Sequence, residues 1–190
     1  MDEDLELALL PVLEAFNFFG IPYRVVGSVA SSYLGLARAT LDVDMVADIR
    51  TEQVNVLSAH LSTGFYADAE MMREAIARVS SFNLIHWESA IKLDIFPVGQ
   101  REYDRVSFAR GVTVHLPRGS ELVSKTPEDI VLGKLEWFEA GERSSERQWR
   151  DIAGLLKVQG ERLDLEYMRR WAGELNLTEL LERAIREAGI

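Results

Sequence analysis

Two aspartates separated by one apolar residue, inside a segment that otherwise resembles a core strand, constrain this chain most. The segment "LDVDMVA", residues 41–47, alternates Asp42 and Asp44 with Val43 and Met45. Asp is depleted in strands, and a buried carboxylate without a partner is strongly disfavoured. Residues two apart in a strand share a face, so both carboxylates point the same way and the apolar pair points into the opposite layer. We therefore expect a positively charged partner to compensate the two neighbouring carboxylates.

A third aspartate has the same kind of surroundings further along the chain. Asp94 stands between Leu93 and Ile95 in "IKLDIFPV". If this strand lies beside the first, three carboxylates converge, and hard divalent cations with oxygen ligands are the natural counter-charge. The sequence thus implies Mg²⁺ bound by Asp42, Asp44 and Asp94. The first two aspartates taken alone are equally typical of a half-exposed strand with one solvated face.

A glycine and a serine stand upstream, between an apolar strand at 23–26 and a helix of small residues. Gly27 lets the backbone approach a ligand closely, and the free N–H groups of a helix that begins at Ser28 favour a phosphate. A phosphate cradle would then adjoin the metal-binding carboxylates. A Gly-Ser turn by itself is also a common way to begin a helix.

The remaining pattern predicts an α+β fold, a mixed β-sheet with flanking helices followed by a helical domain. Composition shifts near Pro117, and Thr126 with Pro127 predicts the start of a helix. We expect one domain at 1–118 and a helical domain at 119–190. The expected strands are 23–26, 41–47, 80–86, 90–98 and 112–116, the expected early helices cover 4–19 and begin at 28 and 51, and the later helices cover about 144–159, 164–173 and 176–188.

Composition limits the classes of function. The 190-residue chain has a formal net charge of -10, which argues against a protein that binds nucleic acid over its whole surface. It contains no cysteine, so disulfides and thiolate metal sites are excluded. The first ten residues are acidic and no apolar run is long enough for a membrane span. We expect a cytoplasmic protein without membrane contact.

At this point the sequence resembles the nucleotidyltransferase superfamily with the DNA polymerase β-type catalytic fold. The matching residues are Val26-Gly27-Ser28, then Asp42-Val43-Asp44-Met45, then Leu93-Asp94-Ile95. The resemblance implies a nucleotidyltransferase catalytic domain and transfer of a nucleoside monophosphate from an NTP to an acceptor hydroxyl, with release of pyrophosphate. It also implies two Mg²⁺ ions held by the three aspartates, and β- and γ-phosphates held at Gly27 and Ser28.

Within the superfamily, the chain looks most like small bacterial proteins related to the AbiEii toxins of toxin–antitoxin systems. Their first motif continues to a basic residue and a Ser or Thr, matched by Arg38 and Thr40, which would help to bind the nucleotide. Their helical half carries a Lys and a later Asp, matched by Lys134 and Asp151 as catalytic candidates. This likeness implies a toxin with an antitoxin partner. Acceptors in the superfamily include RNA, proteins and small molecules, and no motif here chooses among them.

Other interpretations stay open from the sequence. The chain is also compatible with a nucleotide-binding module that keeps the fold without turnover, or with an interaction protein whose acids stabilise the sheet or bind one ion. Lys134 and Asp151 equally fit the charged surface of solvated helices.

Overall fold

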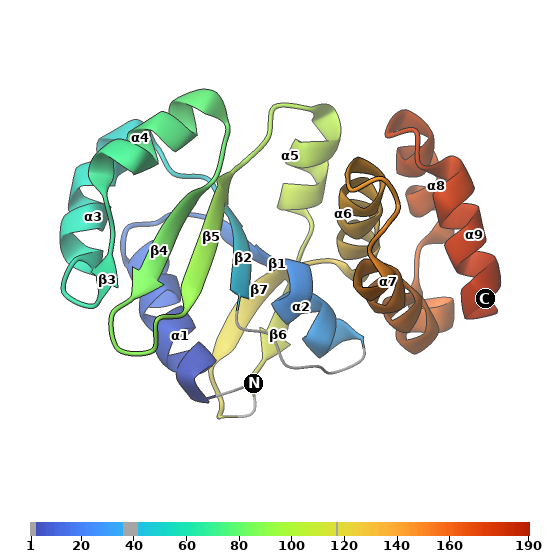
Figure 1. The fold of residues 1–190 in the computed structure, drawn as a ribbon, viewed down its shortest axis with the longest axis horizontal. Coiled ribbons are helices and arrows are strands. Elements are labelled where there is room, and N and C mark those ends of the chain that lie inside the picture. The colour runs from blue at the N-terminus through green and yellow to red at the C-terminus, as the bar shows by residue number, and fades with distance from the viewer. Residues whose placement is uncertain (1–2, 36–41, 117) are drawn as a thin grey trace. The chain divides into compact units, whose positions relative to one another are not determined.

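A computed structural model describes residues 3–35, 42–116 and 118–190 of the chain (Figure 1). The described residues form two compact units. The first contains residues 3–29 and the described part of 42–124, and the second contains residues 30–35 and 125–190. Each unit has its own apolar core, and each is described separately below.

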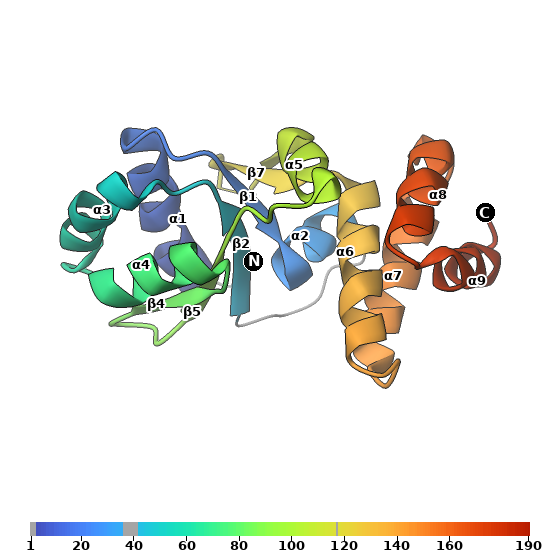
Figure 2. The same cartoon turned by 90° about the horizontal axis from the view of Figure 1, so that it is seen from above.

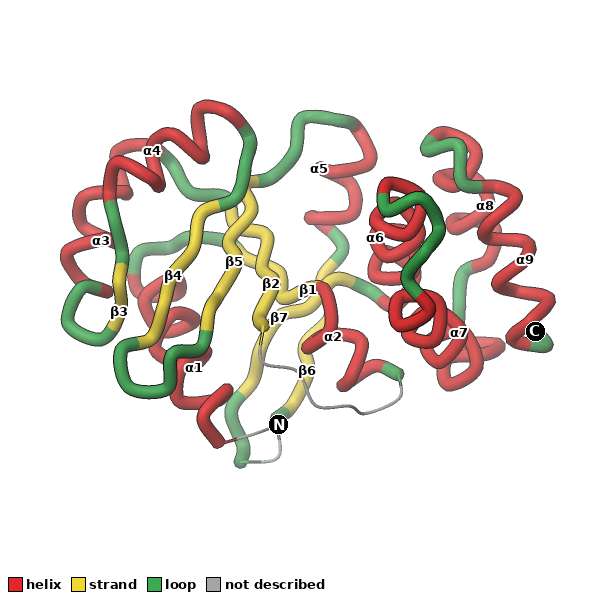
Figure 3. The backbone as a smooth tube through the Cα atoms, viewed as in Figure 1, coloured by secondary structure: helices red, strands yellow, loops and turns green. Residues whose placement is uncertain are grey.

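The first unit is built on a mixed sheet with the strand order β3-β4-β5-β2-β1-β7-β6 (Figure 3). β2 pairs antiparallel with β1 and parallel with β5, and β4 pairs antiparallel with both β5 and β3. The strands are β1 (Tyr23–Val26), β2 (Asp42–Ala47), β3 (Phe65–Tyr66), β4 (Phe82–His86), β5 (Lys92–Pro97), β6 (Gly111–His115) and β7 (Glu121–Lys125).

Helices of the first unit gather on one side of the strands. Figure 1 shows α1 passing behind β4 and β5, and Figure 2 shows α1 and α3 on the same side of these strands. Buried side chains alternate along the strands, so that Val43, Leu93 and Leu84 face this layer and are fully buried. The helical elements are α1 (Glu3–Phe18), the 3-10 turn η1 (Thr51–Gln53), α3 (Val54–Leu61), α4 (Ala69–Arg78) and α5 (Glu102–Ala109).

The second unit is helical. Its first full helix begins as its sequence predicts, because Thr126 accepts a hydrogen bond from the Asp129 backbone N–H and Pro127 occupies the first helical position. Tyr167 donates a hydrogen bond from its hydroxyl to Asp129 at 2.7 Å, which links two helices of the unit. The helical elements are α6 (Pro127–Ala140), α7 (Glu146–Gln159), the 3-10 turn η2 (Gly160–Arg162), α8 (Leu165–Glu174) and α9 (Thr178–Ala188), while α2 (Gly27–Leu34) has residues in both units.

The α+β class, the mixed sheet and the later helices are confirmed. The structure adds elements that the sequence pattern did not predict, namely β3, α4, α5, β7 and the turn η2. β7 pairs with β1 through Val25 and Ser124, so the first unit extends beyond a boundary at 118 and 119. The chain segment expected to begin a helix at Thr51 first forms η1 and then α3. None of the helices described is both long and apolar enough to cross a membrane.

Candidate active site

The three aspartates of the sequence motif lie on neighbouring parallel strands. Asp44 of β2 is directly opposite Asp94 of β5, and Asp42 is opposite Lys92. Asp42 is exposed, whereas Asp44 and Asp94 are partly buried, and the residues between them are fully buried on the other face. The alternation of the strand therefore places all three carboxylates on one face of the sheet, as the sequence predicted.

Gly27 brings the backbone against one of these carboxylates. It follows β1, begins α2 and has a φ of +63°, in the left-handed region that glycine enters without a steric penalty. Val26, the residue before it, pairs with Asp44. A Cβ added at Gly27 would lie 2.8 Å from Asp44 Cγ and still nearer to Oδ2, so only glycine fits this turn without displacing the carboxylate.

Lys92 and Asn83 hold the third carboxylate. Lys92 Nζ lies 2.7 Å from Asp94 Oδ2, and the Asn83 side-chain amide donates a hydrogen bond to Asp94 Oδ1. The hydrogen bond with Asp94 raises the pKa of Lys92, and the negative charges of Asp94, Asp42 and Asp44 raise it further while partial burial opposes the change. One ammonium group thus balances part of the charge of three carboxylates.

The donor set suits a hard divalent cation by its chemistry, because all three side chains offer carboxylate oxygens on one face. Within the described ranges, however, no group of three or more acidic or His side chains is arranged to hold a metal ion as the side chains stand. In this arrangement the Asp94 carboxylate accepts hydrogen bonds from Lys92 and Asn83. By the chemistry of its oxygen donors, this set of three carboxylates fits Mg²⁺.

Lys134 and Asp151 form a buried ion pair in the second unit. Lys134 Nζ of α6 lies 2.9 Å from Asp151 Oδ2 of α7, and the two side chains are 7% and 11% exposed. The sequence alternative in which both belong to solvated helix surfaces is therefore wrong. The pair joins α6 to α7, and a catalytic role for either residue stays a prediction.

The other predicted residues divide into two cases. Ser28 is the second residue of α2 and is partly exposed, beside the turn at Gly27. Arg38 and Thr40 lie outside the described residues.

Sequence reasoning missed Lys92 and Asn83. Lys92 stands two residues before Asp94 in the same strand, so the alternation that places Asp42 and Asp44 on one face also places Lys92 there. Asn83 is identified only by the register of β4, which puts it opposite Asp94. The first residue was accessible from the sequence, and the second needed the structure.

Comparison with solved structures identifies the fold. A solution structure of the antibiotic-resistance factor ANT(2'')-Ia matches with a TM-score of 0.59 and 14% identity over 98% of this chain and 100% of that chain. A crystal structure of an antigenic nucleotidyltransferase-like protein from Paracoccidioides brasiliensis matches with a TM-score of 0.55 and 18% identity over 95% of this chain and 92% of that one. The chain has a nucleotidyltransferase fold. The superfamily-level resemblance seen in the sequence is thus confirmed at the level of fold.

A second structure of ANT(2'')-Ia, in complex with adenylyl-2''-tobramycin, matches with a TM-score of 0.55 and 12% identity over 87% of this chain and 94% of that chain. No protein-family model matches the chain, and no curated protein matches it in sequence. The likeness to AbiEii-related proteins stays a prediction.

Proposed function

We propose that this protein is a metal-dependent nucleotidyltransferase that moves a nucleoside monophosphate from an NTP to an acceptor hydroxyl. The observation that carries the proposal is the arrangement of Asp42, Asp44 and Asp94 on one sheet face beside the Gly27 turn. The fold shared with an adenylylating antibiotic-resistance factor supports the same reaction class.

The reaction is a single in-line displacement at the α-phosphorus. The acceptor oxygen forms a bond to the α-phosphorus, and the bond from that phosphorus to the bridging oxygen breaks. Pyrophosphate leaves with the bonding electron pair, and the acceptor's proton passes to a carboxylate or to solvent. In the proposal two bound Mg²⁺ ions supply charge neutralisation at the attacking and leaving oxygens.

The residues of this chain have separate tasks in the proposal. Asp42 and Asp44 hold the metals, and Asp94 completes the metal site and orients or deprotonates the acceptor hydroxyl. The N–H groups at Gly27 and Ser28 hold the β- and γ-phosphates, because the left-handed turn at Gly27 has no side chain in the way of a close approach. Lys92 holds Asp94 in place when no metal is bound.

The strand order supports a proposal in which the two substrates bind on opposite sides of the acids. β1 and the Gly27 turn lie on one side of β2, and β5 lies on the other side with β4 beyond it. With the β- and γ-phosphates at Gly27 and the acceptor beside Asp94, the leaving pyrophosphate and the attacking oxygen would lie on opposite sides of the α-phosphorus, as an in-line displacement requires.

The finer role of a toxin with an antitoxin partner is a part of this proposal that depends on the sequence resemblance. It is supported by matches at Arg38, Thr40, Lys134 and Asp151, of which the last two form the buried ion pair described above. Expression of the wild-type chain and of Asp44→Asn in a bacterial host tests it. Growth arrest caused by the wild type alone supports a toxin, and equal growth contradicts one.

A second candidate function is a non-catalytic protein in which the acids stabilise the sheet. The ion pair of Lys92 with Asp94 is the observation that favours it, because the acids then have a structural counter-charge without a metal. The two functions differ in what the acids do for stability. Removal of a structural carboxylate lowers the melting temperature, whereas removal of a metal ligand does not.

Label transfer tests the proposal. The protein is incubated with Mg²⁺, cell extract and either α-labelled or γ-labelled NTP, and the label is followed into RNA, protein and small molecules. We expect acceptor labelling from the α-labelled nucleotide only, with loss of labelling in Asp44→Asn. Glu52→Gln, an equal change of charge at an exposed residue of η1, is the control and is expected to keep full activity. Equal labelling by wild type and Asp44→Asn would contradict the proposal.

A further inference from the structure

The face that carries the acids continues sideways into exposed apolar side chains. Asp42 pairs with Lys92, Lys92 pairs with Ile85, and Ile85 pairs with Tyr66, so these residues form one row across β2, β5, β4 and β3. In each strand the neighbouring residue is buried on the opposite face, as Leu84 is in β4 and Phe65 is in β3. The row therefore lies on the face that carries the three aspartates.

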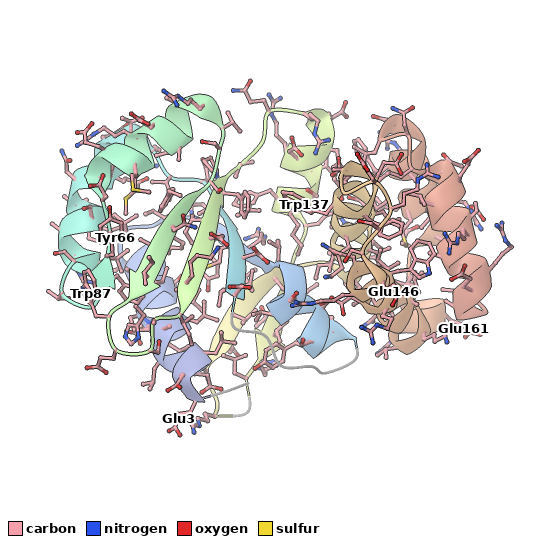
Figure 4. The ribbon with its side chains drawn as sticks, viewed as in Figure 1. Glu3, Tyr66, Trp87, Trp137, Glu146 and Glu161 are labelled. Atoms are coloured by element: carbon pink, nitrogen blue, oxygen red, sulfur yellow. The ribbon has the colours of Figure 1, made fainter. Side chains whose placement is uncertain are left out.

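A tryptophan enlarges the apolar end of this row. Trp87 follows β4 and lies two residues after Ile85, and its backbone N–H donates a hydrogen bond to Gly64 O at 3.0 Å, which continues the pairing of β4 with β3. Its ring contacts Tyr66 edge to face with 6.3 Å between centroids, a separation typical of a favourable aromatic pair. Figure 4 labels both rings at the β3 side of the sheet. We call Tyr66, Ile85 and Trp87 the aromatic shelf.

The three side chains of the aromatic shelf are more exposed to solvent than is usual for large apolar residues. Tyr66 is 39% exposed, Ile85 36% and Trp87 60%. Single exposed apolar residues are ordinary, whereas a contiguous group beside polar residues marks a binding surface. Neighbouring strands lie about 4.8 Å apart, so Ile85 is roughly 10 Å and Tyr66 roughly 14 Å from Asp42 across the sheet. These are the dimensions of a small organic molecule.

We propose that the aromatic shelf binds the acceptor, and that the acceptor is a small hydroxylated molecule with an apolar ring and no net negative charge. This inference rests on the proposed function. The strand order places β4 and β3 on the acceptor side of Asp94, away from the Gly27 turn. An acceptor whose hydroxyl meets Asp94 therefore extends over Ile85 toward Tyr66 and Trp87.

Charge selects among the classes of acceptor. Glu88 follows Trp87 in the hairpin turn and is exposed, and the chain has a net charge of -10. The ammonium of Lys92, the cation within the row, is bound to Asp94. Aromatic side chains also stack on nucleic-acid bases, but the backbone of RNA needs cations to neutralise its phosphates. A neutral or cationic ring compound can bind the aromatic shelf without cations to neutralise phosphate charges.

The reaction balances as described above, because the acceptor's hydroxyl oxygen bonds to the α-phosphorus, its proton leaves and pyrophosphate is released. The shelf contributes only binding. Loss of one large aromatic contact is therefore expected to raise the acceptor concentration for half-maximal rate by roughly three- to ten-fold without changing the rate at saturation.

The test uses α-labelled NTP, Mg²⁺ and the small-molecule, RNA and protein fractions of a cell extract as separate acceptors. We expect label in small molecules that are retained by a reversed-phase column. With the retained fraction as acceptor, Trp87→Ala is expected to need three- to ten-fold more of it, Trp87→Phe is expected to restore most of the affinity, and Trp87→Gln is not. Phe18→Ala on α1, which removes a ring that is 76% exposed, is the control and is expected to change nothing.

The outcomes separate this inference from the function on which it rests. Two results would contradict acceptor binding at the aromatic shelf without contradicting the nucleotidyltransferase activity. One is label that enters RNA, protein or unretained polar molecules, and the other is an unchanged acceptor requirement in Trp87→Ala. Absence of label from every fraction, or equal labelling by Asp44→Asn, overturns the nucleotidyltransferase and the shelf together. Nucleotide binding measured by calorimetry on each Trp87 variant is expected to match the wild type, and a parallel loss of it in Trp87→Ala would contradict a role confined to the acceptor.

Discussion

Replacement of Gly27 by alanine tests the close approach of backbone and carboxylate at the candidate site. The change has two costs. The left-handed conformation at a φ of +63° costs an alanine about 1–2 kcal/mol. The new Cβ would also lie 2.8 Å from Asp44 Cγ, and overpacking of this kind costs about 1–3 kcal/mol. We expect Gly27→Ala to lower the free energy of unfolding by about 2–5 kcal/mol.

A double-mutant cycle separates the two costs. In an Asp44→Ala background the carboxylate is gone and only the aspartate's Cβ position remains, 3.0 Å from the added Cβ. There we expect Gly27→Ala to cost less, about 1–2 kcal/mol for the conformation together with the strain of the remaining Cβ contact. The four proteins are compared by urea denaturation, with slopes checked for equality. An equal cost of Gly27→Ala in both backgrounds would refute the contact between the turn and Asp44.

Three further predictions concern charged residues of the two units. Asp42→Asn is expected to abolish nucleotidyl transfer while the melting temperature holds or rises, because the change relieves repulsion between carboxylates, and a large fall in melting temperature would instead favour a structural role. Lys92→Met is expected to strengthen Mn²⁺ binding measured by calorimetry, since the ammonium no longer competes for Asp94. The same change is expected to destabilise the metal-free protein by no more than about 1 kcal/mol, because Lys92 is 44% exposed. Asp151→Ala is expected to destabilise by about 3–5 kcal/mol in urea, and the double change Lys134→Met, Asp151→Leu by clearly less, because it leaves no buried charge unpaired; equal losses would contradict the buried pair.

The sequence predicted the acid face because it depends on local alternation. Asp42, Val43 and Asp44 fix the two faces of β2 without reference to any other strand. The parallel pairing of β5 with β2 joins residues far apart in the sequence. The residue pattern could not predict this pairing and could only state what would follow from it. The superfamily resemblance implied that the three aspartates share one metal site, and the structure pairs Asp44 with Asp94.

One element that sequence reasoning missed, β7, lacks a clear apolar pattern. β7 is short, begins with Glu121, ends with Lys125 and follows Pro117 and Gly119, which together indicate a boundary. Its partner is β1, about a hundred residues earlier, through Val25. Such a pairing is decided by packing in the folded chain and not by local propensity.

The burial of the ion pair depends on helix packing that the sequence pattern does not show. Lys134 and Asp151 are 17 residues apart on different helices, and each is an ordinary charged residue in its own helical pattern. Only the packing of α6 on α7 buries them together. Charged residues in amphipathic helices are usually solvated, so the sequence could not distinguish this pair from surface charges.

The central claim is that Asp42, Asp44 and Asp94 bind a divalent metal together with an NTP. A titration of the wild-type protein with Mn²⁺, followed by electron paramagnetic resonance of the free ion, with and without a non-hydrolysable NTP analogue, tests it most directly. The account predicts that the nucleotide increases Mn²⁺ binding to the wild type and that Asp44→Asn removes this increase while the protein stays folded. Mn²⁺ binding that is the same in the wild type and in Asp44→Asn would contradict it.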